Sequence, residues 1–376
     1  ASLTCLVYAG VVMATNGISS PATQAPLPSS TSRSLGREGV SMDLPPATTS
    51  SGQSGPHAPH FAQGFGTRVI LTVDTEEEFD WNRPFTRDQH GLKHVSALPR
   101  FQQFCEEIGA HPVYLVDWPI ANDPRAINII GDAVRRGTAD IGVQLHPWVN
   151  PPFDEAVTAH NSFAGNLPRE LEAAKFERLR DQIERAFGTA PQIYRAGRYG
   201  LGPSSADILK ANGIAIDTSV RSLFDYSHGH GPDFSNHPAA PYWVDEERTL
   251  LELPVTSVYW GPLRSMGQRI HRLQRFFPTF FAGFSKLKLL ERIALTPEGV
   301  TAEEAIRGVD VALGDQLPVL VLSLHSPSLA PGFTPYAHTD QDVETLYDWL
   351  RQIYRHLAER GVSSASVADI LSKVQR

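Results

Sequence analysis

The chain has 376 residues, a mass of 41.3 kDa and a formal net charge of −8, and 41% of its residues are hydrophobic. This composition is ordinary for a globular protein and excludes wholesale disorder. The negative charge balance argues against nucleic acid and anionic membranes as partners. The two cysteines, Cys5 and Cys105, are too few for a disulfide scaffold.

The first 66 residues differ in composition from the rest of the chain. They are rich in Ser, Thr, Pro, Gly and Ala and contain few charged residues. Such a segment buries too little apolar surface to offset the entropy that is lost when it becomes ordered. We therefore predict a disordered low-complexity tail over residues 1–66, and one folded domain over 67–376 that tolerates removal of the tail.

One apolar stretch, Leu3–Ala14, interrupts the predicted tail. It has the length of the apolar region of a signal peptide, but no Lys or Arg precedes it, and Met42 offers an alternative start of translation. We expect a cytoplasmic location rather than export. The rest of the chain has no apolar run long enough for a transmembrane helix, so we expect no stable membrane span.

Seven short apolar runs follow Gly66, and helical patterns separate several of them. The runs are Val69–Val73, Val113–Val116, Ile141–Leu145, Ile193–Tyr194, Ile214–Ile216, Leu250–Val255 and Leu317–Leu324. Continuous apolar runs are typical of strands that are buried on both faces of a parallel sheet. The helical patterns are clearest at Arg169–Phe187, Ser204–Asn212 and Asp340–Arg360. This alternation predicts an α/β fold, either a (β/α) barrel or an open sheet.

Polar residues stand where these apolar runs end. They are Asp74, His146, Arg195, Asp217 and His325. The carboxyl ends of parallel strands meet at one edge of a sheet, where α/β proteins form their active sites. Acids, bases and a cation together at that edge favour one convergent site over five unrelated turn or cap residues.

Five carboxylates crowd the seven residues from Asp74 to Asp80. They repel one another unless a divalent cation or an arginine lies among them, although an acidic loop that caps the next helix is the alternative. His146 leaves its predicted strand into a loop that contains Trp148. A neutral imidazole in that place suits a metal ion, and Trp148 is a candidate either for sugar stacking or for packing.

Two further groups carry functional side chains. Arg195 lies in a glycine-rich segment, residues 194–203, where it can orient a carboxylate through paired hydrogen bonds or serve a tight turn. His325 ends the last apolar run and can act as a general acid. The serines nearby, Ser323, Ser326 and Ser328, suggest a Ser-His nucleophile, but no Gly-x-Ser-x-Gly elbow is present, so we disfavour that hypothesis.

Taken in order, five motifs resemble the polysaccharide deacetylase family, also called the NodB-homology carbohydrate esterases. The motifs are VDTEEEFDW (73–81), IGVQLHPWVNPP (141–152), YRAGRYGLGP (194–203), IDTSV (216–220) and LSLHSPSLAPG (322–332). The resemblance spans about residues 68–375 and indicates a divergent branch. It implies a distorted (β/α)7 barrel, a divalent metal with zinc as the expected ion, and removal of an N- or O-acetyl group from a glycan or amino-sugar substrate.

The resemblance also implies catalytic roles. In the family scheme a metal-bound water attacks the acyl carbonyl, and a base and an acid move the protons. Asp74 matches the general base, and Arg195 matches the residue that holds it. His325 matches the general acid, with Asp217 as its partner.

The implied metal ligands include one departure from the family pattern. Glu76 and His146 match ligands, but Gln144 stands where the first histidine of a His-x-His pair is expected. An amide oxygen is a weak ligand for zinc. Two other hypotheses therefore stay open: a metal-independent C–N hydrolase of small amides on the same barrel, and a catalytically silent glycan-binding protein.

Three aromatic residues near these motifs, Trp81, Trp148 and Tyr199, are the candidate substrate-binding side chains. Residues 221–300 are predicted to form a variable insertion, because loops differ most among proteins of one fold.

Within the predicted insertion, His228, His230 and His237 are expected to be loop residues rather than metal ligands. The basic and aromatic stretch Arg269–Lys288 predicts helical hairpins that bury its phenylalanines, or a lid that faces a membrane or a glycan.

Overall fold

A computed structural model describes residues 58–274 and 287–375. Most of the predicted tail lies outside these ranges, as do Phe276, Phe277, Phe280 and Phe281 of the predicted helical hairpins. Of the helices that are described, none combines the length and the apolar character needed to cross a membrane.

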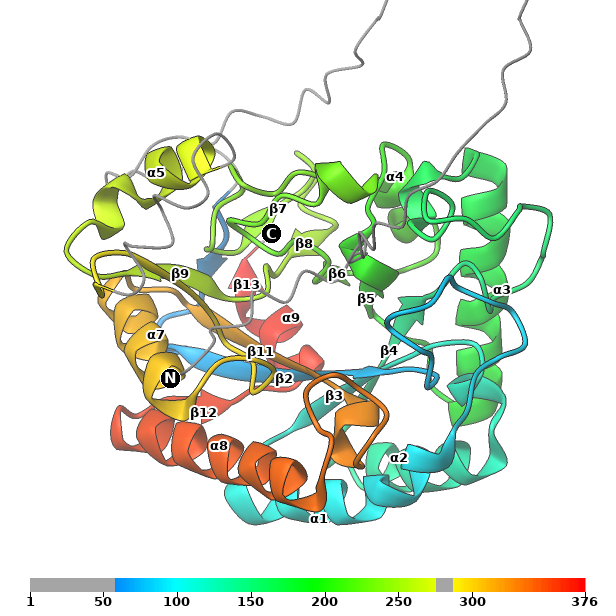
Figure 1. The fold of residues 1–376 in the computed structure, drawn as a ribbon, viewed down its shortest axis with the longest axis horizontal. Coiled ribbons are helices and arrows are strands. Elements are labelled where there is room, and N and C mark those ends of the chain that lie inside the picture. The colour runs from blue at the N-terminus through cyan, green and yellow to red at the C-terminus, as the bar shows by residue number, and fades with distance from the viewer. Residues whose placement is uncertain (1–57, 275–286, 376) are drawn as a thin grey trace, which may run out of the picture.

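Strands and helices alternate along the chain, as the sequence pattern predicts (Figure 1). The strands are β1 (His60–Phe61), β2 (Arg68–Thr75), β3 (Pro112–Val116), β4 (Asp140–Leu145), β5 (Ile193–Ala196), β6 (Ile216–Asp217), β7 (Tyr242–Trp243), β8 (Leu251–Glu252), β9 (Ser257–Trp260), β10 (Glu291–Ala294), β11 (Val319–His325), β12 (Ser363–Ser364) and β13 (Val374–Gln375). The helices are α1 (Leu98–Ile108), α2 (Pro124–Arg135), α3 (Arg169–Phe187), α4 (Ser205–Ala211), α5 (Gly267–Gln274), α7 (Ala302–Gly314), α8 (Asp340–Glu359) and α9 (Val367–Lys373).

Seven of the described strands run parallel in one curled sheet, in the order β11-β2-β3-β4-β5-β6-β8. At the β8 edge, β7 adds an antiparallel strand, and the short β12 pairs with the beginning of β2. Helices α1, α2, α3, α7 and α8 surround the outside of the sheet (Figure 1). The strand–helix–strand connections therefore place these helices outside the sheet. Val367 and Ile370 of α9 instead join the apolar side chains on the inner face.

Backbone hydrogen bonds bridge the seam between the β8 and β11 ends of the sheet. The Thr256 amide donates to the Val321 carbonyl at 3.2 Å, and the Leu295 amide donates to the Thr256 carbonyl at 3.0 Å. The Ser323 amide donates to the Leu295 carbonyl at 3.2 Å. The barrel is distorted because individual hydrogen bonds close this seam in place of a regular ladder of paired strands. The predicted fold class, a distorted (β/α) barrel, is confirmed.

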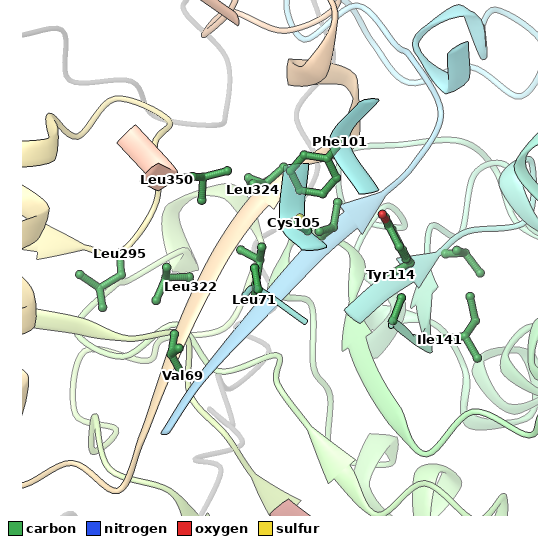
Figure 2. Close-up of a cluster of buried hydrophobic side chains, with 14 of the residues drawn as sticks. Val69, Leu71, Phe101, Cys105, Tyr114, Ile141, Leu295, Leu322, Leu324 and Leu350 are labelled. Atoms are coloured by element: carbon green, nitrogen blue, oxygen red, sulfur yellow. The ribbon is translucent and has the colours of Figure 1, made fainter. Parts of the chain in front are cut away.

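The side chains of β2 alternate between two apolar clusters. Val69 and Leu71 point outward into the cluster beneath the helices, which Figure 2 shows. Ile70 belongs to the second cluster, inside the barrel. Because successive strand residues point to opposite faces, the inward series continues with Thr72 and then Asp74. The interior thus changes from apolar to polar towards the carboxyl end of the strand.

The folded part begins earlier than the predicted boundary at residue 67. His60 and Phe61 pair with the C-terminal strand β13, and the Phe65 side chain is buried. A two-residue strand shows no periodic pattern, so the sequence gives no signal for it. Removal of everything before Gly66 would therefore delete native contacts.

The predicted insertion holds β7 to β10 and α5, and β9 and β10 pair with each other in a separate antiparallel sheet. His228 and His230 lie exposed on its surface, as expected of loop residues. The His237 ring lies 3.0 Å from the Tyr242 hydroxyl.

Candidate active site

The strand register brings the polar strand ends together. His325 of β11 lies directly opposite Asp74 of β2, and Gln144 of β4 lies directly opposite Arg195 of β5. Opposite residues of paired strands point to the same face. All four side chains therefore face the barrel interior at its carboxyl edge, as the sequence analysis expects of Asp74, Arg195 and His325.

Arg195 holds Asp74 in a buried ion pair. Its Nη1 donates to Asp74 Oδ1, its Nη2 donates to Thr72 Oγ1 at 2.8 Å, and its Nε donates to the Thr218 carbonyl at 3.0 Å. Both charged side chains are almost inaccessible to solvent. Because Arg195 is anchored at three points, the Asp74 carboxylate has a fixed orientation.

His325 faces the other oxygen of Asp74, with its Nε2 3.8 Å from Asp74 Oδ2. Its Nδ1 lies 2.6 Å from Glu298 Oε2, and its backbone amide donates to Glu298 Oε1 at 3.0 Å. Burial alone lowers the pKa of His325, but the carboxylate of Glu298, helped by Glu76 and Asp74, raises that pKa to about 10. The imidazole is therefore held as a cation that can donate a proton from Nε2.

Glu298 was missed by the sequence analysis. It lies in the loop between β10 and α7, inside the predicted insertion, where strand and helix periodicity give no guidance. Burial opposes its ionisation, yet the His325 charge and hydrogen bonds, with one from Ser328 Oγ at 2.6 Å, keep its pKa below the usual value.

Asp217 does not partner His325, contrary to the sequence-based prediction. It lies opposite Tyr194, whose side chain belongs to the outer apolar cluster, so Asp217 points away from the barrel interior. It accepts hydrogen bonds from the Ser219 amide and hydroxyl. Strand β6 has only two residues, so the sequence pattern does not determine which of them points to which face of the sheet. The observed register places Asp217 on the outer face.

Glu76, Gln144 and His146, the predicted metal ligands, meet at one carboxylate oxygen. Gln144 Nε2 donates to Glu76 Oε2 at 3.2 Å, and His146 Nε2 lies 3.4 Å from the same oxygen. Burial raises the pKa of Glu76 to about 8, against the charges of His325 and His146. Gln144 Oε1 is buried without a hydrogen-bond partner.

The other ring nitrogen of His146 faces a second group of carboxylates. Ligand atoms of Glu77, Asp117 and His146 all lie within 4.8 Å of one another, and this buried group could hold a metal ion. Its oxygens already have donors: Trp148 Nε1 donates to Glu77 at 2.7 Å, and the Glu77 amide donates to Asp117 at 2.7 Å. With Nδ1 of His146 2.9 Å from Glu77, the group orients the imidazole so that Nε2 faces Glu76.

The three candidate substrate-binding aromatics have different surroundings. Trp148 is 2% exposed and stacks on His146 with ring centroids 4.4 Å apart, so it supports the histidine and has no free face for a sugar. Trp81 is partly exposed, and its ring contacts that of His325 at 5.3 Å between centroids. Tyr199 is also partly exposed and stacks on Tyr226.

A buried hydrogen-bond chain that the sequence analysis missed supports the loop that carries Glu76. His94 Nδ1 lies 2.9 Å from Glu78 Oε1, and His94 Nε2 lies 2.9 Å from Ser326 Oγ. Since the carboxylate of Glu78 accepts, Nδ1 donates to it and Nε2 accepts from the serine. Ser326 Oγ in turn accepts from the Glu76 amide at 3.3 Å. Ser326 is fully buried, which fits a positioning role and not that of a nucleophile.

No family model matches the chain, and no curated protein shows a significant match to its sequence. Among solved structures, it is similar to a protein assigned as a polysaccharide deacetylase from Mycobacterium smegmatis, at 18% identity over 85% of this chain and 94% of that chain, with a TM-score of 0.49. It is also similar to 4-alpha-glucanotransferase from Thermococcus litoralis, at 13% identity over 82% of this chain and 40% of that chain, with a TM-score of 0.45.

A family 4 acetyl xylan esterase from Clostridium thermocellum, in complex with a cobalt ion, is similar at 14% identity over 81% of this chain and 91% of that chain, with a TM-score of 0.39. Identities and TM-scores this low carry no statement about chemistry. The fold therefore rests on the strand order described above, and the function is argued from the side chains.

Replacing Glu298 by Gln is expected to lower the pKa of His325 from about 10 towards the ordinary histidine value of 6.5, because the principal anion beside the ring is lost. A general acid works only when protonated, so the alkaline limb of the activity profile moves to lower pH. Folding raises the pKa of His325 from 6.5 to about 10. The charged pair therefore contributes its whole stabilisation to the fold near and just below pH 6.5, and this contribution is lost as the pH rises through about 10.

Imidazole NMR signals as a function of pH measure this shift, and Glu303→Gln, which removes an exposed glutamate of α7, is the control. An unchanged His325 titration in the Glu298 variant would contradict the assignment of the pair.

Replacing Gly197 by Ala is expected to displace His146. The added Cβ would lie 2.4 Å from His146 Cδ2 and 2.5 Å from the Leu145 carbonyl oxygen. Overpacking of this kind costs about 1–3 kcal/mol, measurable by denaturant unfolding. Gly314→Ala, whose Cβ would meet no atom within 4 Å, is the matched control. Equal stability of the two variants would show that Gly197 does not confine the ring.

Proposed function

We propose that the protein is a hydrolase that removes an acetyl group from an N- or O-acetylated sugar. One observation carries the proposal. Asp74, held by Arg195, and His325, held as a cation by Glu298, face each other on neighbouring strands with 3.8 Å between Oδ2 and Nε2. A carboxylate base beside an imidazolium acid can supply both proton transfers of an acyl hydrolysis.

The proton transfers follow from the two side chains. Asp74 takes a proton from the attacking water, whose oxygen forms a bond to the acyl carbon. When the bond from that carbon to the sugar nitrogen or oxygen breaks, His325 Nε2 gives its proton to the leaving atom. Arg195 keeps the Asp74 carboxylate in place throughout, and Glu298 stabilises the His325 cation before the transfer.

The residues present fit a divalent cation, for which zinc is the proposed ion. Glu76, Gln144 and His146 converge on one point, and the unpartnered Gln144 Oε1 would become a ligand if its amide turned over. A cation would also relieve the burial that raises the pKa of Glu76. When bound, it supplies polarisation of the acyl oxygen and a lowered pKa of water.

A sugar suits the surroundings of the acid. Trp81 places its ring edge-on to His325 and stacks on Phe79 with 5.2 Å between centroids. Partly exposed aromatic rings beside a few convergent polar groups are typical of ligand sites.

The second candidate function is a metal-independent hydrolase of small amides. The observation that favours it is the hydrogen bond from Gln144 Nε2 to Glu76, which satisfies the carboxylate without a cation. The two candidates differ in their need for metal, which the following measurements test.

Purified protein supplied with zinc is expected to release acetate from N-acetylated amino-sugar oligomers or acetylated xylan, and chelator is expected to stop the release. Asp74→Asn is expected to lower the rate by a factor on the order of 10²–10⁴ because it removes the base. Asp80→Asn, an exposed carboxylate of the same loop, is the control. Native rates in the Asp74 variant would refute the assigned base, and chelator-resistant release would favour the metal-independent candidate.

Gln144→His is expected to raise zinc affinity by about tenfold or more, because imidazole replaces a weak amide ligand. Gln144→Ala is expected to lower it. Competition with a chromogenic chelator measures both affinities without any turnover. Identical affinities in the native protein and both variants would exclude Gln144 from the metal site.

A further inference from the structure

Arg221 carries a charge that no described carboxylate neutralises. It follows β6 on the chain, and its Nη1 donates to the Tyr226 hydroxyl at 3.2 Å. No ion pair joins it to any acid in the described ranges, and its Nε is buried without a hydrogen-bond partner. Arg195, by contrast, is fully paired with Asp74. A partly buried guanidinium without a counter-ion is costly unless an anion reaches it.

Aromatic rings surround this arginine. Its guanidinium carbon lies 4.1 Å from the ring centroid of Phe224 and 5.5 Å from that of Tyr199. Tyr199 stacks on Tyr226 with 5.7 Å between centroids. Tyr199, Arg221, Tyr226 and Tyr336 are all partly exposed, and we call these four residues the tyrosine–arginine cluster. Phenol hydroxyls and a guanidinium donate hydrogen bonds, as a carboxylate or phosphate requires.

The tyrosine–arginine cluster adjoins the candidate active site. The Trp81 ring contacts both His325, at 5.3 Å, and Tyr336, at 5.9 Å, between ring centroids. On the other side, burial raises the pKa of Tyr199, the charge of Arg221 opposes this rise, and Tyr226 and then the Asp74 carboxylate add smaller upward contributions. An anionic substituent on an acetylated sugar could therefore reach the cluster while the acyl group faces Asp74 and His325.

The backbone at Tyr199 is held in an unfavourable conformation. Arg198 and Tyr199 have φ of 57° and 60°, in the left-handed region that residues with a side chain seldom adopt. Two consecutive residues of this kind persist where the surrounding structure fixes them, and such positions cluster at ligand sites. In this conformation the centroid of the Tyr199 ring lies 5.5 Å from the Arg221 guanidinium carbon.

We propose that the tyrosine–arginine cluster binds a carboxylate or phosphate group of the substrate, so that the acetylated sugar is anionic. The inference rests on the proposed function for the position of the acyl group.

The test measures binding in the full chain carrying His325→Gln, which removes the proposed acid so that no turnover occurs and leaves Arg195 paired with Asp74. The neutral probe is N-acetylglucosamine. Three derivatives carry an anion at different positions: a phosphate on C1, a lactyl ether carboxylate on C3 or a carboxylate at C6. We expect at least one derivative to bind about tenfold or more tightly than the neutral sugar, and the preference to weaken as salt is raised.

Adding Arg221→Gln is expected to abolish the preference, and Arg221→Lys to keep part of it. Arg100→Gln, which removes an exposed arginine paired with Glu344, controls for the change in net charge. Circular dichroism melts verify that each variant is folded.

Affinities within twofold for all four sugars would overturn the inference, as would a preference that survives Arg221→Gln. In that case the cation is stabilised by the aromatic rings alone. The proposed function is tested separately through acetate release by the native protein. Preferential binding of an anionic sugar without acetate release would contradict the proposed function and support the cluster. Acetate release combined with equal affinities for all four sugars would support the proposed function and contradict the role of the cluster.

Discussion

The buried ion pair between Arg195 and Asp74 is the interaction on which the carboxyl edge of the barrel depends. It joins β2 to β5, and through Thr218 it reaches the segment after β6. Two charges are tolerated away from water only when their remaining hydrogen-bonding groups have partners. For the guanidinium of Arg195, Thr72 and Thr218 are these partners. Removing one partner from such a pair costs about 3–5 kcal/mol. The same bonds that stabilise the strand ends fix the orientation of the proposed base.

The sequence predicted those helices and strands whose apolar residues recur with a regular spacing. Helix Arg169–Phe187 has the bounds expected from its apolar stripe and from the Gly188 stop, because both signals are local. The strand ends at Asp74 and His325 were identifiable because long apolar runs precede them. Glu298 and His94 reach the site from a loop and a 3-10 helix, whose positions are set by tertiary packing and not by any repeat along the chain.

The His146 ring lies between two groups of acidic side chains whose different surroundings are not evident from the sequence. Glu76 and Glu77 are adjacent in the chain, yet they face different nitrogens of one imidazole. The Glu77 side is closed by Trp148 and Asp117, whereas the Glu76 side holds the unpartnered oxygen of Gln144. This asymmetry makes Glu77 a support and Glu76 a ligand in the proposed site.

Anomalous diffraction at the zinc absorption edge, from crystals grown with zinc, tests the central claim most directly. The proposed chemistry places the ion on the Nε2 side of His146, bonded to Glu76 and close to Asp74 and His325. A single peak there is the expected result. A peak between Glu77, Asp117 and Nδ1 would contradict the arrangement, because the ion would then lie behind the imidazole and away from the proposed base and acid. The absence of any peak at saturating zinc would contradict the metal-dependent mechanism.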